Sequence, residues 1–394
     1  MLVKYGFLVD SNLIESQQAD YLRRKICYEN KLQLVVMPTS GCNFRCVYCF
    51  EEERQQTMTS DNVNAIISYL DKNMKKFSST NIQWFGGEPL LCKKEIETIM
   101  QAALEFAKRD RKALTSGITT NGYLLDLQTY KMLRKYHTSW IQVSVDGVKE
   151  THNRQRPHKT DKNSYDKIIE NLRAIRDKTK PSACKIYYRV TITKQILPRI
   201  NEILRFFKEE FATDPRFKLS LQPEMDWGGD RIENEQSNIP SVRDTVSCLY
   251  KANELGLMPI GHHTQLHSGL ICEATRLNSY VFYPGNKIYK CPMAIYSKYD
   301  SSLYHGEIGA VGNEGQLIID EKINAEWIES APFRKDECFR CKYYVLCFGV
   351  QTCPLARKFS KNNQRNICKK SIYEEYIPAE TYALYYLDKL DKRL

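Results

Sequence analysis

Short apolar segments alternate with amphipathic segments along most of the chain. Residues 31–37 (KLQLVVM) are almost continuously apolar, which is typical of a strand buried on both faces. From residue 59 to about residue 77, apolar side chains recur at helical spacing instead, and Thr59, Ser60 and Asp61 are suited to begin a helix. The same alternation predicts further strands at 81–85, 114–119, 140–145, 184–193 and 217–222, and helices at 93–109, 127–136, 165–176 and 199–210.

Six strand–helix repeats predict parallel strands in a barrel-like α/β fold, which we place at residues 31–235. Folds of this kind carry their chemistry on the loops at the C-terminal ends of the strands. Residues 1–30 are predicted to form a short N-terminal segment with a helix at 17–28, and residues 236–264 a linker with a helix at 242–255. A cysteine-rich domain is predicted at 265–375 and a C-terminal helix at 376–394.

Composition excludes several classes of protein. With 394 residues, 42% of them hydrophobic and 27% charged, the chain has the composition of a water-soluble globular protein. No apolar run reaches membrane-spanning length and the N-terminus lacks the layout of a signal peptide, so we expect a cytoplasmic protein without a membrane partner. The net charge of +11 favours acidic partners, such as an acidic peptide or an acidic electron carrier. No nucleic-acid-binding module is recognisable, and we expect no nucleic-acid partner.

Candidate chemistry begins directly after the first predicted strand. Cys42, Cys46 and Cys49 are separated by three and two residues, and Tyr48 and Phe50 flank the last cysteine. Thiolates are ligands suited to iron–sulfur clusters, and a cluster of four irons bound by three cysteines keeps one iron open for another ligand. A zinc site is the alternative, although structural zinc usually has four protein ligands.

This run resembles the CxxxCxxC signature of the radical S-adenosylmethionine (SAM) enzymes. The resemblance implies an open six-stranded (β/α)6 partial TIM barrel and a [4Fe-4S] cluster whose fourth iron is completed by SAM. In that family, an electron from the reduced cluster cleaves SAM to methionine and a 5′-deoxyadenosyl radical, which abstracts a hydrogen atom from the substrate. A flavodoxin or ferredoxin would be the reductant.

Other motifs at predicted strand ends fit the same family. Gly86-Gly87-Glu88-Pro89 resembles the motif that holds the SAM ammonium, and Ser144-Val145-Asp146-Gly147 with His152 and Arg156 resembles the SxDG…HxxxR stretch near the ribose and carboxylate of SAM. Asn153 stands where the family usually has Asp, and Arg154 is the alternative to Arg156. The resemblance implies SAM contacts from Tyr48, Gly86, Gly87, Glu88, Ser144, Asp146, Arg156 and Gln222. Glu224, Asp226 and Asp230 are candidate catalytic residues by position alone.

The last third of the chain holds a second set of cysteines, which resembles the SPASM domain of radical SAM enzymes. The resemblance implies two auxiliary iron–sulfur clusters, both expected to be [4Fe-4S]. The ligands implied for the first cluster are Cys272, Cys291 and Cys353, and those for the second are Cys338, Cys341, Cys347 and Cys368. Five residues rather than three separate Cys347 from Cys353. The fourth ligand of the first cluster stays open between Cys248, His263, His267 and a coordination site left free for substrate.

Radical SAM enzymes with SPASM domains mostly modify peptides or proteins. We therefore expect a maturase that forms a thioether or carbon–carbon crosslink in a ribosomally made precursor peptide, one that recognises an acidic leader without a separate N-terminal recognition domain. The alternative is an anaerobic sulfatase-maturing enzyme that oxidises Cys or Ser to formylglycine. Such enzymes usually have Asp directly after the second SPASM cysteine, where this chain has Pro292. A non-catalytic electron relay or iron sensor is a third possibility, and it predicts no cleavage of SAM.

Overall fold

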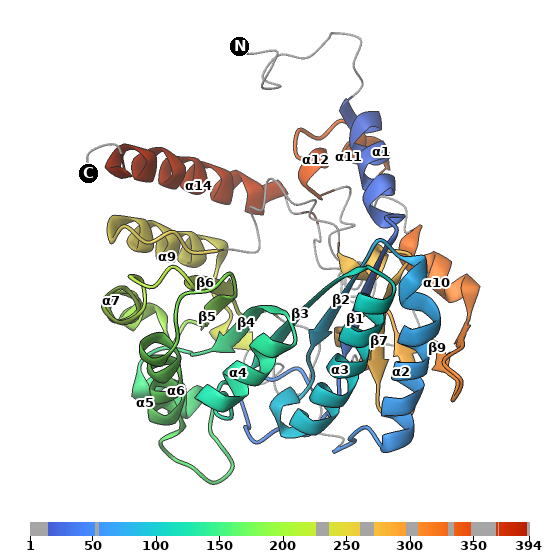
Figure 1. The fold of residues 1–394 in the computed structure, drawn as a ribbon. Coiled ribbons are helices and arrows are strands. Elements are labelled where there is room, and N and C mark those ends of the chain that lie inside the picture. The colour runs from blue at the N-terminus through green and yellow to red at the C-terminus, as the bar shows by residue number, and fades with distance from the viewer. Residues whose placement is uncertain are drawn as a thin grey trace.

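The fold is built on one open sheet of ten strands in a computed structural model, which describes residues 15–51, 55–225, 236–260, 272–296, 306–329, 335–347, 368 and 370–391 (Figure 1). The strand order is β10-β9-β8-β7-β1-β2-β3-β4-β5-β6. Strands β1 to β6 are parallel throughout and comprise Lys31–Val36, Ser79–Trp84, Ala113–Thr120, Thr138–Ser144, Lys185–Ile192 and Phe217–Pro223. The predicted open, parallel α/β architecture is therefore confirmed.

Helices connect the parallel strands in the predicted order. They are α2 (Ser60–Asn73), α3 (Lys93–Arg109), α4 (Leu127–Lys135), α5 (Lys149–Gln155), α6 (Ser164–Lys178) and α7 (Ile200–Glu210). Their apolar sides pack with the strands in one large core, in which Ile82, Ile118 and Ile186 are fully buried. The predicted helix at 59–77 is shorter than expected, because its last turn tightens into a 3₁₀ helix at Met74–Lys76.

Side-chain caps fix the starts of two of these helices. Thr59 accepts a hydrogen bond from the backbone N–H of Asn62, and the Asn62 side chain accepts one in return from the N–H of Thr59. Asp126 accepts from the N–H of Thr129 at the start of α4. Such caps satisfy backbone donors that have no partner within the helix. They therefore set where the loops at the C-terminal ends of β1 and β3 finish.

The C-terminal region continues the same sheet. Strand β7 (Ser279–Tyr283) pairs in parallel with β1, and β8 (Lys287–Tyr289), β9 (Glu307–Val311) and β10 (Leu317–Ile319) add antiparallel strands beyond it. Helix α10 (Glu321–Ile328) follows β10. Strands β7 and β8 form a hairpin directly before Cys291. Strand β1, which leads into the cysteine motif, is thus bordered by β2 on one side and by β7 on the other.

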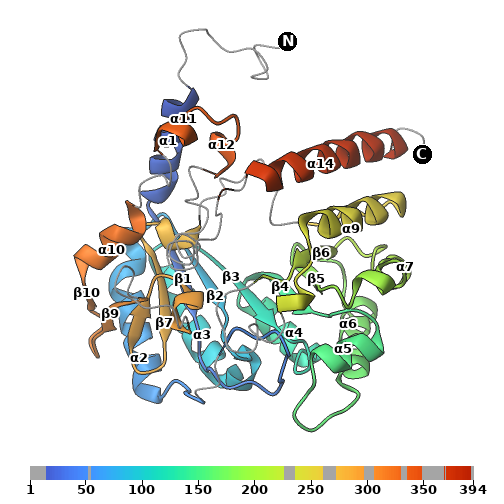
Figure 2. The same ribbon diagram turned by 180° about the vertical axis from the view of Figure 1, so that it is seen from behind.

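Two groups of helices lie near the chain termini. Helix α1 (Glu15–Cys27) packs against α12 (Tyr344–Cys347), close to α11 (Lys335–Phe339), and Figures 1 and 2 agree on this arrangement. Helix α14 (Lys370–Asp391) lies beside α9 (Val242–Glu254), which itself contacts α7 and β6. The predicted C-terminal helix therefore packs on α9.

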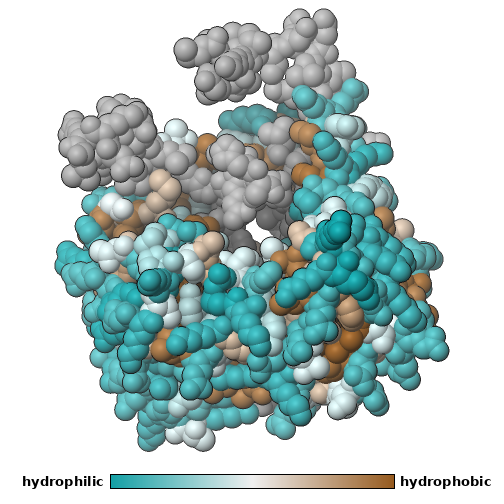
Figure 3. Space-filling model, in the orientation of Figure 1, coloured by the Kyte–Doolittle hydropathy of each residue, from teal (hydrophilic) through white to brown (hydrophobic). Residues whose placement is uncertain are grey.

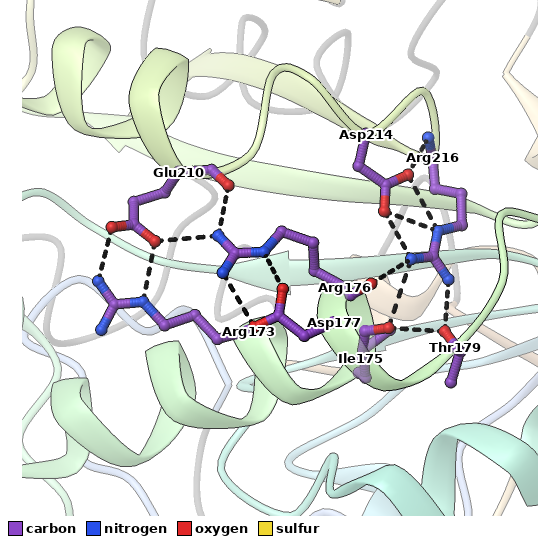
Figure 4. A network of polar contacts seen from close by, with 8 residues as sticks. All are labelled: Arg173, Ile175, Arg176, Asp177, Thr179, Glu210, Asp214 and Arg216. Carbon is purple, nitrogen blue, oxygen red and sulfur yellow. Dashed lines mark hydrogen bonds and ion pairs between the residues drawn. The ribbon is translucent and has the colours of Figure 1, made fainter.

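A polar network joins the ends of α6 and α7 to the start of β6 (Figure 4). The Arg216 side chain is 1% exposed, and its Nε donates to both carboxylate oxygens of Asp214 at 3.0 Å. Its Nη1 also donates to Thr179 Oγ1, and its Nη2 donates to the carbonyl oxygens of α6. The carbonyl groups at the end of α6 have no partner within the helix, and the Arg216 guanidinium supplies charged donors to two of them. The network therefore holds the end of α6 against the sheet.

The surface in the view of Figure 3 is largely hydrophilic over the described residues. Among those residues, no helix combines the length and the apolar character that crossing a membrane requires.

Candidate functional site

A cavity of about 370 Å³ lies where the six parallel strands end. Every strand from β2 to β6 contributes lining residues at or just beyond its C-terminal end, and the loop after β1 supplies the rest. Met293, in the 3₁₀ helix Pro292–Ile295, adds a contact from the C-terminal region. This position agrees with the expectation that the chemistry of the fold is carried by the loops at the strand ends.

The cysteine loop, defined here as residues 38–51, forms one wall of the cavity. Cys42, Cys46 and Cys49 all line it. Three backbone hydrogen bonds anchor the loop to the segment after α5: Arg45 N donates to Pro157 O (2.8 Å), Val47 N to Gln155 O (2.9 Å) and Lys159 N to Asn43 O (2.9 Å). The three thiols are thus held on a loop that is tied to the β4–α6 connection.

The glycines of the Gly86-Gly87-Glu88-Pro89 turn are required by the cysteine loop. A Cβ on Gly87 would lie 2.3 Å from the carbonyl oxygen of Gly41, and a Cβ on Gly86, whose φ is +112°, would lie 2.5 Å from that of Thr39. The N–H groups of Gly87 and Glu88 donate to these same carbonyls, at 3.1 and 2.9 Å. Both glycines also line the cavity. The turn therefore supports the cysteines and faces the cavity at the same time.

The Glu88 carboxylate lies behind the cavity wall and is fully buried. Its Oε1 accepts from Thr120 Oγ1 (2.7 Å) and from Leu90 N (3.0 Å), and its Oε2 accepts from Asn121 N (2.7 Å). Burial raises the pKa of this carboxyl group, although these hydrogen bonds oppose the shift. Glu88 thus joins the loop after β2 to the end of β3.

The predicted residues Tyr48, Asp146 and Arg156 form one buried cluster. Arg156 Nη1 donates to the Tyr48 hydroxyl at 2.6 Å and lies 3.3 Å from Asp146 Oδ2, and the Tyr48 hydroxyl also contacts that oxygen. The other carboxylate oxygen, Oδ1, accepts from Thr191 N at 2.7 Å. Tyr48 and Arg156 line the cavity, whereas Asp146 is fully buried behind them. Both oxygens of Asp146 therefore already have partners.

His152 is buried next to this cluster, where its Nδ1 accepts a hydrogen bond from Asp146 N at 3.2 Å. Burial lowers the pKa of His152 to about 3, with a further contribution from the charge of Arg156. The ring is therefore neutral and supports the turn after β4.

Three further predicted residues line the cavity: Ser144 and Gln222, expected near SAM, and the candidate catalytic residue Glu224. The Gln222 amide nitrogen donates to Ser220 Oγ at 3.1 Å, and Glu224 is 4% exposed. The other two candidate catalytic residues, Asp226 and Asp230, lie outside the described residues.

The second cysteine set is described only in part. Cys272 precedes β7, Cys291 follows β8 and is 9% exposed, and Cys338, Cys341 and Cys347 lie on or between α11 and α12, with Cys341 N donating to Cys338 O. Cys368 is half-buried, while Cys353, His263 and His267 lie outside the described residues. Cys248 is 1% exposed within α9. No three His, Cys, Asp or Glu side chains of the described segments lie close enough together to hold a single metal ion.

Glu51 and Arg189 are among the cavity residues that the sequence analysis did not select. Glu51 is part of the cysteine loop, and burial raises the pKa of its carboxyl group to about 8. Arg189 lies on β5, next to Ser144 in the register between β4 and β5. A charged residue inside the apolar run KIYYRVTI was the available signal for Arg189, and a glutamate two residues beyond the last cysteine was the signal for Glu51.

The donor chemistry of the cysteine loop fits a metal cluster. Burial raises the pKa of Cys42 to about 12 and raises that of Cys49 as well. Thiols in such an environment remain protonated unless a metal replaces the protons, because a bound metal deprotonates its cysteine ligands. Three thiols around one cavity can bind three irons of a [4Fe-4S] cluster and leave the fourth facing the cavity.

Comparison with known proteins identifies the class to which this fold and site belong. Residues 36–206 match the model of the Radical SAM superfamily. The chain therefore contains a radical SAM domain.

The similar proteins include modifiers of peptides and proteins. The chain is 24% identical over 353 residues to a cysteine-type anaerobic sulfatase-maturating enzyme of Clostridium perfringens (strain 13), covering 81% of this chain and 88% of that enzyme. It is 23% identical over 385 residues to the radical SAM cyclopropyl synthase TigE of Paramaledivibacter caminithermalis, covering 90% and 76%. A match to the Fe-coproporphyrin III synthase of Methanosarcina barkeri, at 28% identity, spans only 44% of this chain and 40% of that protein.

Solved structures share the fold. The structure of native anSMEcpe with bound AdoMet superposes with a TM-score of 0.66 at 18% identity, covering 92% of this chain and 99% of that one. Streptococcus suis SuiB bound to its precursor peptide SuiA superposes with a TM-score of 0.57 at 15% identity, covering 90% and 82%. At these identities the likeness establishes the fold, and the reaction has to be argued from the site.

Proposed function

We propose that this chain is a radical SAM maturase that crosslinks a ribosomally made precursor peptide. The observation that carries the proposal is the convergence of three cysteines and six other predicted residues on one cavity. Cys42, Cys46 and Cys49 line it together with Tyr48, Gly86, Gly87, Ser144, Arg156 and Gln222. These residues come from several loops and strand ends, and each was selected from the sequence for a role in binding SAM or its cluster.

Each wall of the cavity has a distinct task in this proposal. The three thiols hold a [4Fe-4S] cluster that, once reduced, supplies the electron for reductive cleavage of SAM to methionine and a 5′-deoxyadenosyl radical. The backbone of Gly86 and Gly87, which lines the same cavity as the thiols, is proposed to contact the ammonium group. Ser144 and Gln222 flank the nucleoside side.

The crosslink requires removal of two hydrogens from the peptide. One leaves as a hydrogen atom that converts the deoxyadenosyl radical to 5′-deoxyadenosine. When the remaining carbon radical bonds to a sulfur or carbon atom of the same peptide, one proton and one electron are released. The proposed electron acceptors are auxiliary clusters held by the second cysteine set. Of that set, Cys291 lies two residues before Met293, which lines the cavity.

Oxidation of Cys or Ser to formylglycine is the second candidate. The likeness to a sulfatase-maturating enzyme over most of both chains supports it. Pro292 argues against formylglycine formation. This residue directly follows Cys291 and begins a 3₁₀ helix, and its side chain cannot accept a proton. The crosslinking reaction does not depend on a carboxylate at that position.

The proposal is tested with anaerobically reconstituted protein, dithionite and SAM. We expect 5′-deoxyadenosine and methionine in equal amounts from the wild type and none from Cys46→Ala. With a candidate precursor peptide, mass spectrometry should show a product lighter by two hydrogens. A product that has lost a cysteine sulfur would favour formylglycine. A failure to form any deoxyadenosine would refute both reactions.

A further inference from the structure

The last residue of α1 lies beside the second cysteine set, although the two are far apart in the sequence. Cys27 ends α1 and is 1% exposed. Its Sγ lies 3.8 Å from Thr275 Oγ1 and accepts a hydrogen bond from Arg23 Nη1 at 3.9 Å, and its carbonyl oxygen accepts one from Leu277 N at 2.8 Å. The N–H and the hydroxyl of Thr275 both donate to the carbonyl oxygen of Cys272, at 2.9 and 2.7 Å. Cys27 is therefore fastened to the turn that begins at Cys272.

A buried ammonium group lies next to the same turn. Lys290, directly after β8, is 2% exposed, and among the described residues its Nζ donates to carbonyl oxygens of residues 276–279 at 2.7 to 3.4 Å and forms no ion pair. The groups of negative charge that act on it are Cys272, Cys27 and, more weakly, the exposed carboxylate of Glu321. A buried cation requires a compensating negative charge. Cys27 and Cys272 supply that charge as thiolates, the form in which a buried cysteine binds a metal.

The donors at this position fit a cluster rather than a single metal ion. Cys27, Cys272 and Cys291 are free thiols, and Cys291 is 9% exposed. No three His, Cys, Asp or Glu side chains of the described segments could hold one ion, and that result includes the three thiols of the cysteine loop. Thiolates on a [4Fe-4S] cluster each bind a different iron and therefore lie farther apart than the ligands of one ion.

We propose that Cys27 is a ligand of the first auxiliary cluster, beside Cys272 and Cys291, in the position that the sequence analysis left open. The inference rests on the proposed function, in which the second cysteine set holds auxiliary clusters. A cluster core with a thiolate on every iron has a net negative charge, which compensates Lys290. Cys248, the cysteine alternative from the sequence, lies on α9, and its electrostatic neighbours are two residues of that same helix.

This assignment narrows the role of the first auxiliary cluster. A cluster whose irons all have protein ligands offers no coordination site to a sulfur atom of the substrate. It can then accept the electron released by crosslinking, while the peptide is bound by side chains elsewhere. The N-terminal helix α1 thereby becomes part of the electron-accepting half of the protein.

The test counts iron in protein that lacks the cluster of the cysteine loop. Full-length chain with Cys42, Cys46 and Cys49 replaced by Ala is reconstituted anaerobically, and iron, sulfide, Mössbauer and EPR spectra are measured before and after mild oxidation. This background protein should hold about eight irons in two [4Fe-4S] clusters and keep them on oxidation. Adding Cys27→Ala exposes one iron, so oxidation should release about one iron per chain and produce the EPR signal of a [3Fe-4S] cluster.

Other cysteine variants provide matched controls. Cys92→Ala and Cys184→Ala remove buried thiols of the barrel, 5% and 0% exposed, and should leave the iron content and the spectra unchanged. Cys27→Ser has nearly the size of the native residue and offers an oxygen ligand. It should keep the iron but change the EPR signal of the reduced cluster, an effect that a merely structural cysteine would not have. Circular dichroism of each variant checks its folding.

Combined variants decide which cluster Cys27 serves, because Cys338 packs against the same small apolar cluster as Cys27. Cys27→Ala with Cys272→Ala should destroy one cluster and leave one intact [4Fe-4S] spectrum. Cys27→Ala with Cys338→Ala should damage both clusters, so that no intact spectrum remains. The reverse pattern would assign Cys27 to the second cluster and overturn the inference.

The inference is also overturned if Cys27→Ala keeps all its iron on oxidation, or if Cys248→Ala loses iron in its place. Either result leaves the auxiliary clusters, and hence the proposed function, intact. A background protein that binds no iron at all would refute the auxiliary clusters themselves, and with them both the inference and the proposed electron acceptors.

Discussion

Substitution of Gly87 by alanine tests whether the glycine turn supports the cysteine loop. The new Cβ would lie 2.3 Å from the Gly41 carbonyl oxygen, and the next nearest atoms are also backbone, at 2.6 and 2.7 Å. Carbon and oxygen need more than 3 Å, so the loop would have to move by about 1 Å. Backbone atoms cannot rotate away as the end of a side chain can.

The cost follows from that displacement. Forcing an extra methyl group into a packed site typically costs about 1–3 kcal/mol. The shift also strains the hydrogen bonds from Gly87 N and Glu88 N to the loop, each worth about 1 kcal/mol. We therefore expect a loss of about 2–4 kcal/mol, concentrated where Cys42 is attached.

The assay measures iron per chain after anaerobic reconstitution, together with the melting temperature. Gly87→Ala should bind less iron at the cysteine loop and melt several degrees lower. Gly41→Ala is the control from the same loop, because its Cβ would meet only the Thr39 side-chain oxygen, at 3.2 Å. Wild-type iron content and melting temperature in Gly87→Ala would refute the assigned role of the turn.

Three further outcomes follow from the site and its support. Arg216→Met leaves Asp214 buried and unpaired, so it should lower the free energy of unfolding by about 3–5 kcal/mol in a denaturant titration. The control Arg173→Met removes a mostly exposed pair with Glu210 and should lower it by no more than about 1 kcal/mol. Equal losses in the two variants would contradict the role assigned to Arg216. His152 has a folded pKa of about 3, below its unfolded value, so the unfolded chain binds the extra proton and stability should fall as pH drops from about 6.5 towards 3. In His152→Asn this acid sensitivity should be smaller, and in the exposed control His137→Asn it should persist. Tyr48→Phe removes the hydroxyl between Arg156 and Asp146 and should weaken SAM binding about 10-fold without loss of the cluster, as judged by its absorption spectrum; an unchanged SAM affinity would exclude a role for this hydroxyl.

Local patterns were sufficient to predict the parallel part of the fold. The strands and helices between residues 31 and 223 occur where apolar periodicity places them, because each element buries one apolar face within its own length. The residues of the cavity were also predictable, since they follow the strands whose C-terminal ends meet. Arg189 was not selected, because a single charged residue within an apolar strand does not show that its side chain lines the cavity.

The pairing between segments far apart in the sequence could not be predicted either. Nothing in residues 279–283 indicates that this strand joins β1 rather than forming a separate sheet, because backbone pairing carries no local periodicity. The contact of Gly87 with Gly41 likewise joins two loops 46 positions apart, and no spacing rule specifies it. The packing of α14 on α9 depends on where both elements lie after the barrel has formed.

The parallel pairing of β7 with β1 has a consequence for how this enzyme can be divided. A fragment that stops before residue 272 would turn β1 from an interior strand into an edge, with a row of unsatisfied N–H and C=O groups along Gln33 to Val36. Those positions are among the most apolar of the chain, and an uncovered apolar edge invites pairing with another molecule. The barrel and the cysteine-rich half should therefore be made together, and a barrel expressed alone should self-associate.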